Sequence, residues 1–277
     1  MESKITVKDI LALKSKRKIT MLTAYDYPLA SLIDRAGIDI ILVGDSLANV
    51  VLGLETTKQV GMTEMLISAK AVTRAAKHAL IIGDMPYESY QINSQESVKN
   101  ASRFMNEANC DAIKLEWFDK CLEVTEAIIK AGIPVMGHIG LTPQTADKIG
   151  GFKVQGKDAE AAKRLITQAL ALEKLGSFSI VLECVPDEIA KIITQKLSIP
   201  TISCGAGINC DGQVLVTHDI LGLFERFKPK FVKQYINLAP LIQAAVEEYK
   251  TEVIQEKFPT KEHSFSIKEE ELKKIKE

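Results

Sequence analysis

Eight short apolar runs, separated by segments with helical periodicity, constrain the fold of this 277-residue chain. Runs such as IDIILVGDS and FSIVLEC are almost continuously apolar, which is typical of parallel strands that are buried on both faces. Eight strands with intervening helices predict a (β/α)8 TIM barrel, an α/β fold. The predicted strands are Ile19–Ala24, Ile38–Val43, Ala79–Gly83, Asp111–Glu116, Ile133–His138, Phe178–Glu183, Thr201–Gly205 and Gln213–His218.

The segments between these strands carry helix signals. The segment from Pro28 to Ala36 has a proline near its start and Gly37 just past its end, the usual asymmetry of a helix. An open doubly wound sheet is the alternative fold, but its first strand should lead into G-x-G-x-x-G, whereas this one ends in TAYDY. Further helices are predicted after an N-cap at Thr63, from an N-cap at Ser94 to Ala108, and over Asp119–Ala131, Ala159–Leu175, Pro186–Leu197 and Leu238–Ile254.

Both ends of the chain add short elements to the predicted barrel. Thr6 and Asp9 fit a capping box, which predicts a short N-terminal helix that closes the lower end of the barrel. From Lys268 to Glu277, eight of ten residues are charged, which is typical of a solvated helix or a disordered segment. We therefore expect one catalytic domain over residues 1–264 and a charged C-terminal tail over residues 265–277.

Composition and charge exclude several classes of protein. With 35 basic and 36 acidic side chains, the formal net charge is −1, so we expect neither a nucleic-acid partner nor an anionic membrane surface. The chain has no apolar run of the roughly 18 residues that a membrane span needs. The first 20 residues lack an apolar stretch followed by a small-residue cleavage site, so we expect no secretion signal. Its five cysteines include no C-x-x-C pair, so we expect free thiols in a reducing cytoplasm.

Polar side chains follow the apolar strands at the ends where barrel enzymes place their active sites. In chain order they are Asp45, Ser46, Asp84, Lys114, Glu116, His138 and Glu183. Four of the seven are carboxylates, which would repel one another at one mouth unless a cation or protons intervened. Oxygen ligands with few histidines or cysteines favour Mg²⁺ over zinc.

Each of these residues also has a purely structural interpretation. A single aspartate at a strand end is usually a helix N-cap or a turn residue. Lys114 faces the same side of its strand as Glu116, where it could pair with a substrate carboxylate, form a Schiff base, or join a structural ion pair with Glu116 or Asp84. His138 could be a core or turn histidine. Glu183 could be a general base with a raised pKa, or half of a salt bridge.

Several motifs together give the chain a specific resemblance. TAYDYPLA, LVGDSLANVVLG, GDMP, IKLE, GHIGLTPQ, GGFKVQG, LECVP, GAG and DGQVLVTHD occur in this order, followed by KEHSF at residues 261–265. The set resembles the ketopantoate hydroxymethyltransferase family from about Thr20 to His263. The resemblance implies a (β/α)8 barrel that transfers a one-carbon unit from 5,10-methylenetetrahydrofolate to a Mg²⁺-stabilised enolate of 3-methyl-2-oxobutanoate, giving 2-dehydropantoate, in the first step of pantothenate biosynthesis. It also implies a cytoplasmic homo-oligomer, typically a decamer.

The resemblance assigns roles to residues of these motifs. Asp45 of VGDS and Asp84 of GDMP would bind Mg²⁺ and, through it, the substrate, and Glu116 of IKLE would join the metal site, directly or through water. Ser46 and Lys114 would hold the keto acid, with His138 close to it. Glu183 of LECVP would transfer the proton, and the metal and the lysine would stabilise the charge that develops.

The chain departs from the family pattern at two places. Trp117-Phe118 follows K-x-E where glycines are usual, and Ser203-Cys204 precedes GAG where Gly-Ile is common. Three other functions are compatible with parts of the pattern. They are a carbon–carbon or phosphorus–carbon lyase acting on small oxo acids, a Schiff-base aldolase that uses Lys114, and a barrel that only binds a metabolite or forms a structural oligomer. GHIGLTPQ and LECVP favour the transferase over the lyase.

Overall fold

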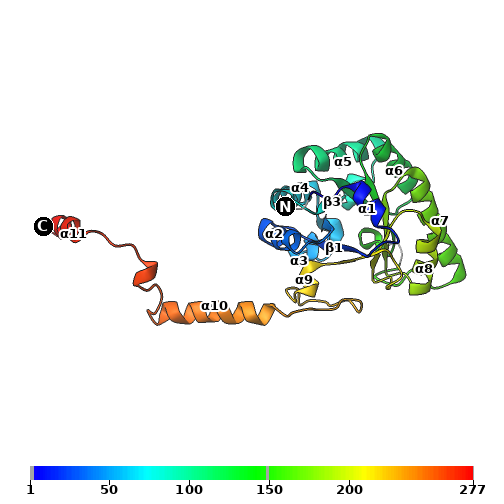
Figure 1. The fold of residues 1–277 in the computed structure, drawn as a ribbon. Coiled ribbons are helices and arrows are strands. Elements are labelled where there is room, and N and C mark those ends of the chain that lie inside the picture. Colours follow the sequence, from blue (N-terminus) through cyan, green and yellow to red (C-terminus); the bar gives the residue numbers. More distant parts are fainter. Residues whose placement is uncertain (1–2, 148–149, 277) are drawn as a thin grey trace.

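The computed structural model describes residues 3–147 and 150–276, and its centre is a closed barrel of eight parallel strands (Figure 1). Each strand pairs with its neighbours in sequence, and β1 pairs with β8 to close the barrel. The predicted TIM barrel is confirmed, with all eight strands. Their bounds are β1 (Ile19–Thr23), β2 (Ile40–Val43), β3 (Leu80–Asp84), β4 (Ala112–Glu116), β5 (Val135–Gly140), β6 (Ser179–Glu183), β7 (Thr201–Cys204) and β8 (Gly212–Leu215).

One long helix follows each of the first six strands and packs around the barrel. In order they are α2 (Tyr27–Arg35), α4 (Met62–Ala75), α5 (Ser94–Ala108), α6 (Cys121–Lys130), α7 (Ala159–Leu175) and α8 (Asp187–Lys196). Residues 205–211 join β7 to β8 without a helix, and β8 leads into the four-residue α9 (Thr217–Ile220). Among the residues described, no long helix of this chain packs on the barrel after β7 or after β8.

Four predicted details of these elements are wrong. The residue that caps α4 is Gly61, not Thr63, and α5 is capped by Asn93, whose Oδ1 accepts from the Glu96 N–H at 2.9 Å. Ser94 is the first residue inside α5. β5 continues to Gly140, so His138 lies within this strand, and β8 stops at Leu215, so His218 belongs to α9.

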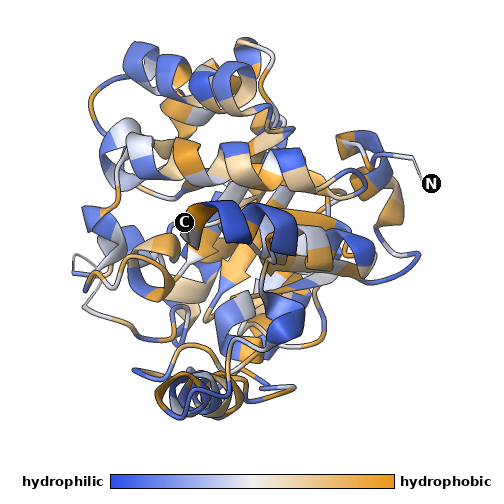
Figure 2. Cartoon of the chain, turned by 90° about the vertical axis from the view of Figure 1, so that its left-hand side faces the viewer, coloured by the Kyte–Doolittle hydropathy of each residue, from blue (hydrophilic) through white to orange (hydrophobic). Residues whose placement is uncertain are grey.

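The barrel has two apolar layers because successive side chains of a strand point to opposite faces. One set, which includes Ile41, Ile81 and Ile113, points outward and packs under the helices. The alternate set, which includes Ile40, Leu80 and Ile202, fills the barrel itself. Figure 2 shows the strands, largely hydrophobic, at the centre of helices of mixed hydropathy.

A short helix closes the lower end of the barrel, as the capping box predicts. α1 (Val7–Leu13) is capped by Thr6, and the Thr6 N–H donates to Asp9 Oδ2 at 2.8 Å. Ile10 of this helix is fully buried in the cluster that fills the barrel. Access to the barrel interior is therefore from the carboxyl ends of the strands.

The last part of the chain leaves the barrel as an arm (Figure 1). It carries α10 (Ala239–Ile254), a short 3-10 turn at Lys261–His263, and α11 (Glu269–Lys276). No residue of α10 is buried, and Leu241, Val246 and Tyr249 are each more than half exposed. The boundary between a domain over residues 1–264 and a tail over residues 265–277 stays a prediction.

Two expectations from composition can be compared with the structure. All five cysteines are free thiols, and three of them are buried. In the described ranges, no helix combines the length and the apolar character that crossing a membrane requires.

Candidate active site

The alternation of side chains along the strands brings a set of polar groups inside the barrel. Ile82 and Ala112 belong to the inner layer, so Asp84 of β3 and both Lys114 and Glu116 of β4 also face inward. Met136 and Val181 do the same for His138 of β5 and Glu183 of β6. The distances between these side chains show that the barrel brings them together, as the sequence predicts.

Asp45 and Asp84 lie side by side at the ends of β2 and β3. The Asp45 N–H donates to Asp84 Oδ2 at 3.1 Å, so this carboxylate orients the start of the β2–α3 segment. Ser46 lies next to them, and its Oγ is 2.7 Å from the hydroxyl of the buried Tyr25. Ser46 precedes α3 (Leu47–Val50) but its side chain makes no capping hydrogen bond, and Asp45 is 7% exposed.

Lys114 is the basic group among these carboxylates. Its Nζ lies 2.8 Å from Asp84 Oδ1 and 3.3 Å from His138 Nδ1. Burial alone would lower the pKa of Lys114, but Asp84, Asp45 and Glu116 outweigh it, so the net shift is upward. The ammonium therefore stays charged and holds the carboxylates together.

His138 lies between the two glutamates. Its Nδ1 is 3.5 Å from Glu116 Oε1 and its Nε2 is 3.2 Å from Glu183 Oε2. Burial, followed by the charge of Lys114, lowers the pKa of His138 well below its usual value. A neutral imidazole donates from only one nitrogen, so it can hydrogen-bond one of these glutamates when both are ionised.

Glu183 is the most accessible of the inward carboxylates. Its side chain is 16% exposed, against 1% for Glu116 and for Asp84. Burial raises the pKa of Glu183 to about 8, and Lys114 acts in the opposite direction. Cys204 belongs to the Ser203-Cys204 pair, which departs from the family pattern. Its thiol hydrogen-bonds the Glu183 carboxylate and also lowers the pKa of Glu183. A carboxyl group with a pKa near neutrality suits proton transfer.

Burial also shifts the other carboxyl groups. Burial and the neighbouring Asp45 raise the pKa of Asp84 to about 7, despite the opposing charge of Lys114. Burial and the same aspartate raise the pKa of Glu116 well above its usual value. Burial is the largest cause of each shift, and the neighbouring carboxylates, which outnumber the single lysine, add to it.

Gln144 is a site residue that the sequence analysis missed. It follows β5 in the GHIGLTPQ segment and is fully buried. Its backbone N–H donates to Glu116 Oε2 at 3.1 Å, and its Nε2 donates to Asp45 Oδ2 at 3.1 Å. The hydroxyl of buried Tyr90 donates to Gln144 Oε1 at 2.5 Å and fixes the amide orientation. The GHIGLTPQ motif was the one signal in the sequence that could have pointed to Gln144, but its role depends on contacts that only the fold shows.

The same residues fit a divalent cation. Asp45, Asp84 and Glu116 supply oxygen atoms only, and Glu116 Oε1 is buried without a hydrogen-bond partner among the residues described. No three His, Cys, Asp or Glu side chains in these ranges are grouped closely enough to hold an ion by themselves. Mg²⁺ usually takes only one or two protein carboxylates and keeps several waters, so the arrangement suits it.

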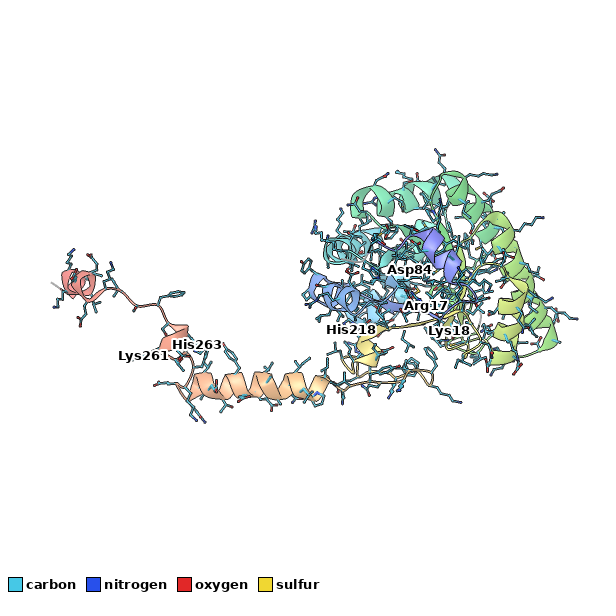
Figure 3. The ribbon with its side chains drawn as sticks, viewed as in Figure 1. Arg17, Lys18, Asp84, His218, Lys261 and His263 are labelled. Atoms are coloured by element: carbon cyan, nitrogen blue, oxygen red, sulfur yellow. The ribbon has the colours of Figure 1, made fainter. Side chains whose placement is uncertain are left out.

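The KEHSF motif does not join this cluster within one chain. Figure 3 places Asp84 inside the barrel, whereas Lys261 and His263 lie on the arm, far from it. The GAG segment after β7 also remains at the rim, where Ser203 Oγ accepts from the Ala206 N–H at 2.9 Å. That contact explains the segment as a tight turn.

Comparison with solved structures agrees with the barrel. The chain is similar to a phosphonopyruvate hydrolase solved with oxalate and Mg²⁺, with a TM-score of 0.59 and 16% identity over 98% of this chain and 96% of that one. It is also similar to 2,3-dimethylmalate lyase, a member of the PEP mutase/isocitrate lyase superfamily, with a TM-score of 0.60 and 14% identity over 99% and 95% of the two chains. At this identity the likeness shows the fold alone.

Sequence comparison is more specific. Two similar relatives are both named 3-methyl-2-oxobutanoate hydroxymethyltransferase. The one from Syntrophomonas wolfei is 55% identical over 95% of both chains. The one from Syntrophobacter fumaroxidans is 53% identical over 99% of this chain and 98% of the relative. Residues 4–261 match the family model described as ketopantoate hydroxymethyltransferase. The chain therefore belongs to the ketopantoate hydroxymethyltransferase family.

Proposed function

We propose that this protein transfers a hydroxymethyl group from 5,10-methylenetetrahydrofolate to 3-methyl-2-oxobutanoate, the first step of pantothenate biosynthesis. A C–C bond forms between C3 of the keto acid and the methylene carbon, and that carbon's bond to folate nitrogen breaks. Water supplies the hydroxyl group, and the products are 2-dehydropantoate and tetrahydrofolate. The observation that carries the proposal is the buried cluster of inward carboxylates around Lys114, in a chain that belongs to this family.

Three carboxylates are proposed as the metal site. Asp45 and Asp84 would hold Mg²⁺, and Glu116 would join them directly or through water. When bound, the cation would act as a Lewis acid on the keto oxygen of the substrate. Two observations support the assignment: Glu116 Oε1 is buried without a hydrogen-bond partner among the residues described, and the donor set contains only oxygen atoms.

Lys114 and Ser46 are proposed to bind the keto acid. The Lys114 ammonium, already 2.8 Å from Asp84, would offset the charge of the substrate carboxylate. The Ser46 hydroxyl, held by Tyr25, can donate to the same substrate. His138 would lie beside the substrate and orient Glu183, from which its Nε2 is 3.2 Å away.

Glu183 is proposed as the base that removes the C3 proton. It is the least buried of the inward carboxylates, so a substrate at the mouth reaches it first. The proton moves to Glu183 Oε, and the electron pair left on C3 is delocalised into the carbonyl as an enolate. That carbon then attacks the methylene group of the folate.

The alternative functions predict different chemistry at Lys114. A Schiff-base aldolase needs a neutral amine, whereas the carboxylates around Lys114 raise its pKa and keep it protonated. Borohydride added with the keto acid should therefore trap no adduct. An adduct at Lys114 would replace the enolate mechanism with the aldolase mechanism.

Deuterium exchange tests the first half of the reaction. With 3-methyl-2-oxobutanoate and Mg²⁺ in D₂O, without folate, deuterium should enter at C3, and Glu183→Gln should stop the exchange. Full turnover with methylenetetrahydrofolate, with and without EDTA, tests the second half and the metal. Absence of 2-dehydropantoate with the complete mixture would contradict the proposal and favour the lyase.

The family resemblance also leads us to propose a cytoplasmic homo-oligomer, a decamer. The arm supports self-association, because Leu241, Val246 and Tyr249 are exposed on α10 while, within residues 3–147 and 150–276, no long helix packs on the barrel after β7 or β8. A second copy of the chain would cover these side chains. Light scattering should give the decamer for the wild type and a smaller species for Leu241→Glu with Val246→Glu. A monomeric wild type would overturn the proposal.

A further inference from the structure

A cavity of about 560 Å³ opens beside the carboxylate cluster. It lies between the segment after β4, the segment after β5 and the first turns of α7. Its size falls in the range that small-molecule sites occupy. We call it the Trp117 pocket. The residues that line it include Gln91, Trp117, Phe118, Lys120, Gln155 and Arg164.

The Trp117 pocket borders the proposed catalytic groups. Trp117 directly follows Glu116, and its backbone N–H donates to the His138 carbonyl at 2.9 Å. On the other side, Gly140 lines the pocket and lies opposite Glu183 in the β5–β6 register. A ligand in the pocket would therefore lie next to the residues that activate the keto acid.

The inner part of the pocket offers an aromatic surface and an unsatisfied donor. Phe118 is held against Tyr90, with ring centroids 5.0 Å apart, and Trp117 lies beside it in the sequence. Gln91 Nε2 is inaccessible to solvent and has no hydrogen-bond partner among the residues described. A buried amide donor is costly unless an acceptor reaches it. Aromatic faces and an amide donor together suit a flat heterocycle that carries a carbonyl oxygen.

The outer part of the pocket carries positive charge. Lys120 is exposed, and Arg164 on α7 has a side chain that is 60% exposed and pairs with Glu160 at 3.0 Å. Asp119 also lines this edge. A guanidinium and an ammonium near the opening suit a ligand with carboxylates at the end away from its heterocycle.

We propose that the Trp117 pocket binds the folate co-substrate, with its pterin ring against Trp117 and Gln91 and its glutamate carboxylate toward Arg164. This inference rests on the proposed function, since it names where the second substrate of that reaction binds. The ring would then project its reactive carbon toward Glu183, across Gly140. The aromatic pair that departs from the family pattern thereby acquires a role as the wall of this site.

Binding of tetrahydrofolate, without turnover, tests the pocket. Trp117 is the only tryptophan of the chain, so its fluorescence reports on the pocket alone. Titration of the full-length protein with tetrahydrofolate should quench this emission to saturation. Gln91→Leu should weaken the affinity about tenfold, because one buried hydrogen bond is lost. Trp117→Leu, followed by calorimetry, should weaken it about tenfold or more.

A matched control separates the pocket from general surface charge. Arg164→Ala should weaken tetrahydrofolate binding several-fold, whereas Arg103→Ala should not change it, although Arg103 forms the same i,i+4 pair with Glu107 on α5. For the pocket variants, the affinity for 3-methyl-2-oxobutanoate should change by less than twofold. Unchanged tetrahydrofolate affinity in Gln91→Leu and Trp117→Leu would overturn the proposal.

A failure of tetrahydrofolate to bind in the Trp117 pocket can be told apart from a failure of the proposed reaction. Deuterium exchange into the keto acid by the wild type requires no folate, so its loss would contradict the enolisation step and leave the binding result intact. Conversely, normal exchange together with quenching that never saturates would place the folate outside the Trp117 pocket.

Discussion

Lys114 Nζ lies 2.8 Å from Asp84 Oδ1, and both side chains are almost inaccessible to solvent. The pair joins two neighbouring strands, because Asp84 ends β3 and Lys114 lies opposite it in β4. It is therefore a structural ion pair as well as the proposed charge partner of the substrate. Of the three interpretations of Lys114 that the sequence left open, the structural ion pair and the pairing with a substrate carboxylate are therefore compatible.

Removal of this lysine should destabilise the fold in a pH-dependent way. Lys114→Met leaves Asp84 buried without its partner, and we expect a loss of about 3–5 kcal/mol of unfolding free energy at pH 8. The loss should be smaller at pH 5, because Asp84, with its pKa near 7, is then protonated and uncharged. Lys130→Met, which breaks an exposed pair with Glu126, should cost less than about 1 kcal/mol. Urea denaturation at pH 5 and pH 8 measures the unfolding free energy of each variant. Equal losses for Lys114→Met and Lys130→Met would contradict the prediction.

The pH dependence of C3 exchange should follow Glu183. The base works when deprotonated, so the exchange rate should rise with pH and level off above about pH 8, where the raised pKa of Glu183 lies. Added Mg²⁺ should move the midpoint to lower pH, because positive charge favours the carboxylate. Glu183→Gln should reduce the rate by about 10²–10⁴-fold, whereas Glu188→Gln, on the exposed start of α8, should not. A midpoint near pH 4 would contradict the assignment.

Stability without metal should fall as pH rises. Both Asp84 and Glu183 have folded-state pKa values above their usual ones, so the folded chain binds more protons than the unfolded chain between about pH 5 and 8. Each group should contribute a decrease of up to about 1.4 kcal/mol per pH unit within that window. Mg²⁺ should therefore raise the melting temperature more at pH 8 than at pH 6, and NaCl of equal ionic strength should not. A larger gain at pH 6 would exclude Asp84 as a metal ligand.

Gln144 should affect metal affinity more than stability. Its amide orients Asp45 and its backbone N–H holds Glu116, so Gln144→Met removes the support of one proposed ligand while it keeps the volume. We expect Mg²⁺ affinity, measured by calorimetry, to fall about 10–100-fold. Gln243→Met, on exposed α10, serves as the control. Unchanged affinity would place the metal away from Asp45.

Gly140 should be irreplaceable because of its position against β6. Its φ is +96°, and an added Cβ would lie 2.3 Å from the Glu183 carbonyl oxygen. Gly132 has a similar φ of +84°, but a Cβ there meets nothing within 4 Å. Gly132→Ala should thus cost about 1 kcal/mol of backbone strain, whereas Gly140→Ala should cost more and also abolish exchange. Equal effects in denaturation and exchange assays would contradict the steric explanation.

The sequence predicted most of the barrel because its signals are local. Continuous apolar runs identify strands buried on both faces, and the two-residue alternation makes Lys114 and Glu116 share a face. The capping box at Thr6 and Asp9 predicted α1 for the same reason. Strand ends were less accurate, since β5 continues through His138 to Gly140, where pairing with β6 extends it.

The part of the site that could not be predicted depends on contacts between distant segments. Tyr90 and Gln144 are 54 residues apart, and although Gln144 ends the GHIGLTPQ motif, no local pattern shows that its amide contacts Tyr90 and Asp45. The pKa of Glu183 depends on burial and on Lys114, Asp45 and Cys204, which come from other strands or loops. Local sequence patterns do not show which distant residues become neighbours in the fold.

The seven residues of α1 determine how molecules reach the centre. Since this helix buries Ile10 in the cluster that fills the barrel, the far end of the barrel is closed. Any molecule that binds at the inward carboxylates therefore enters and leaves at the opposite rim, so a short N-terminal helix makes the barrel a blind-ended site with a single entrance.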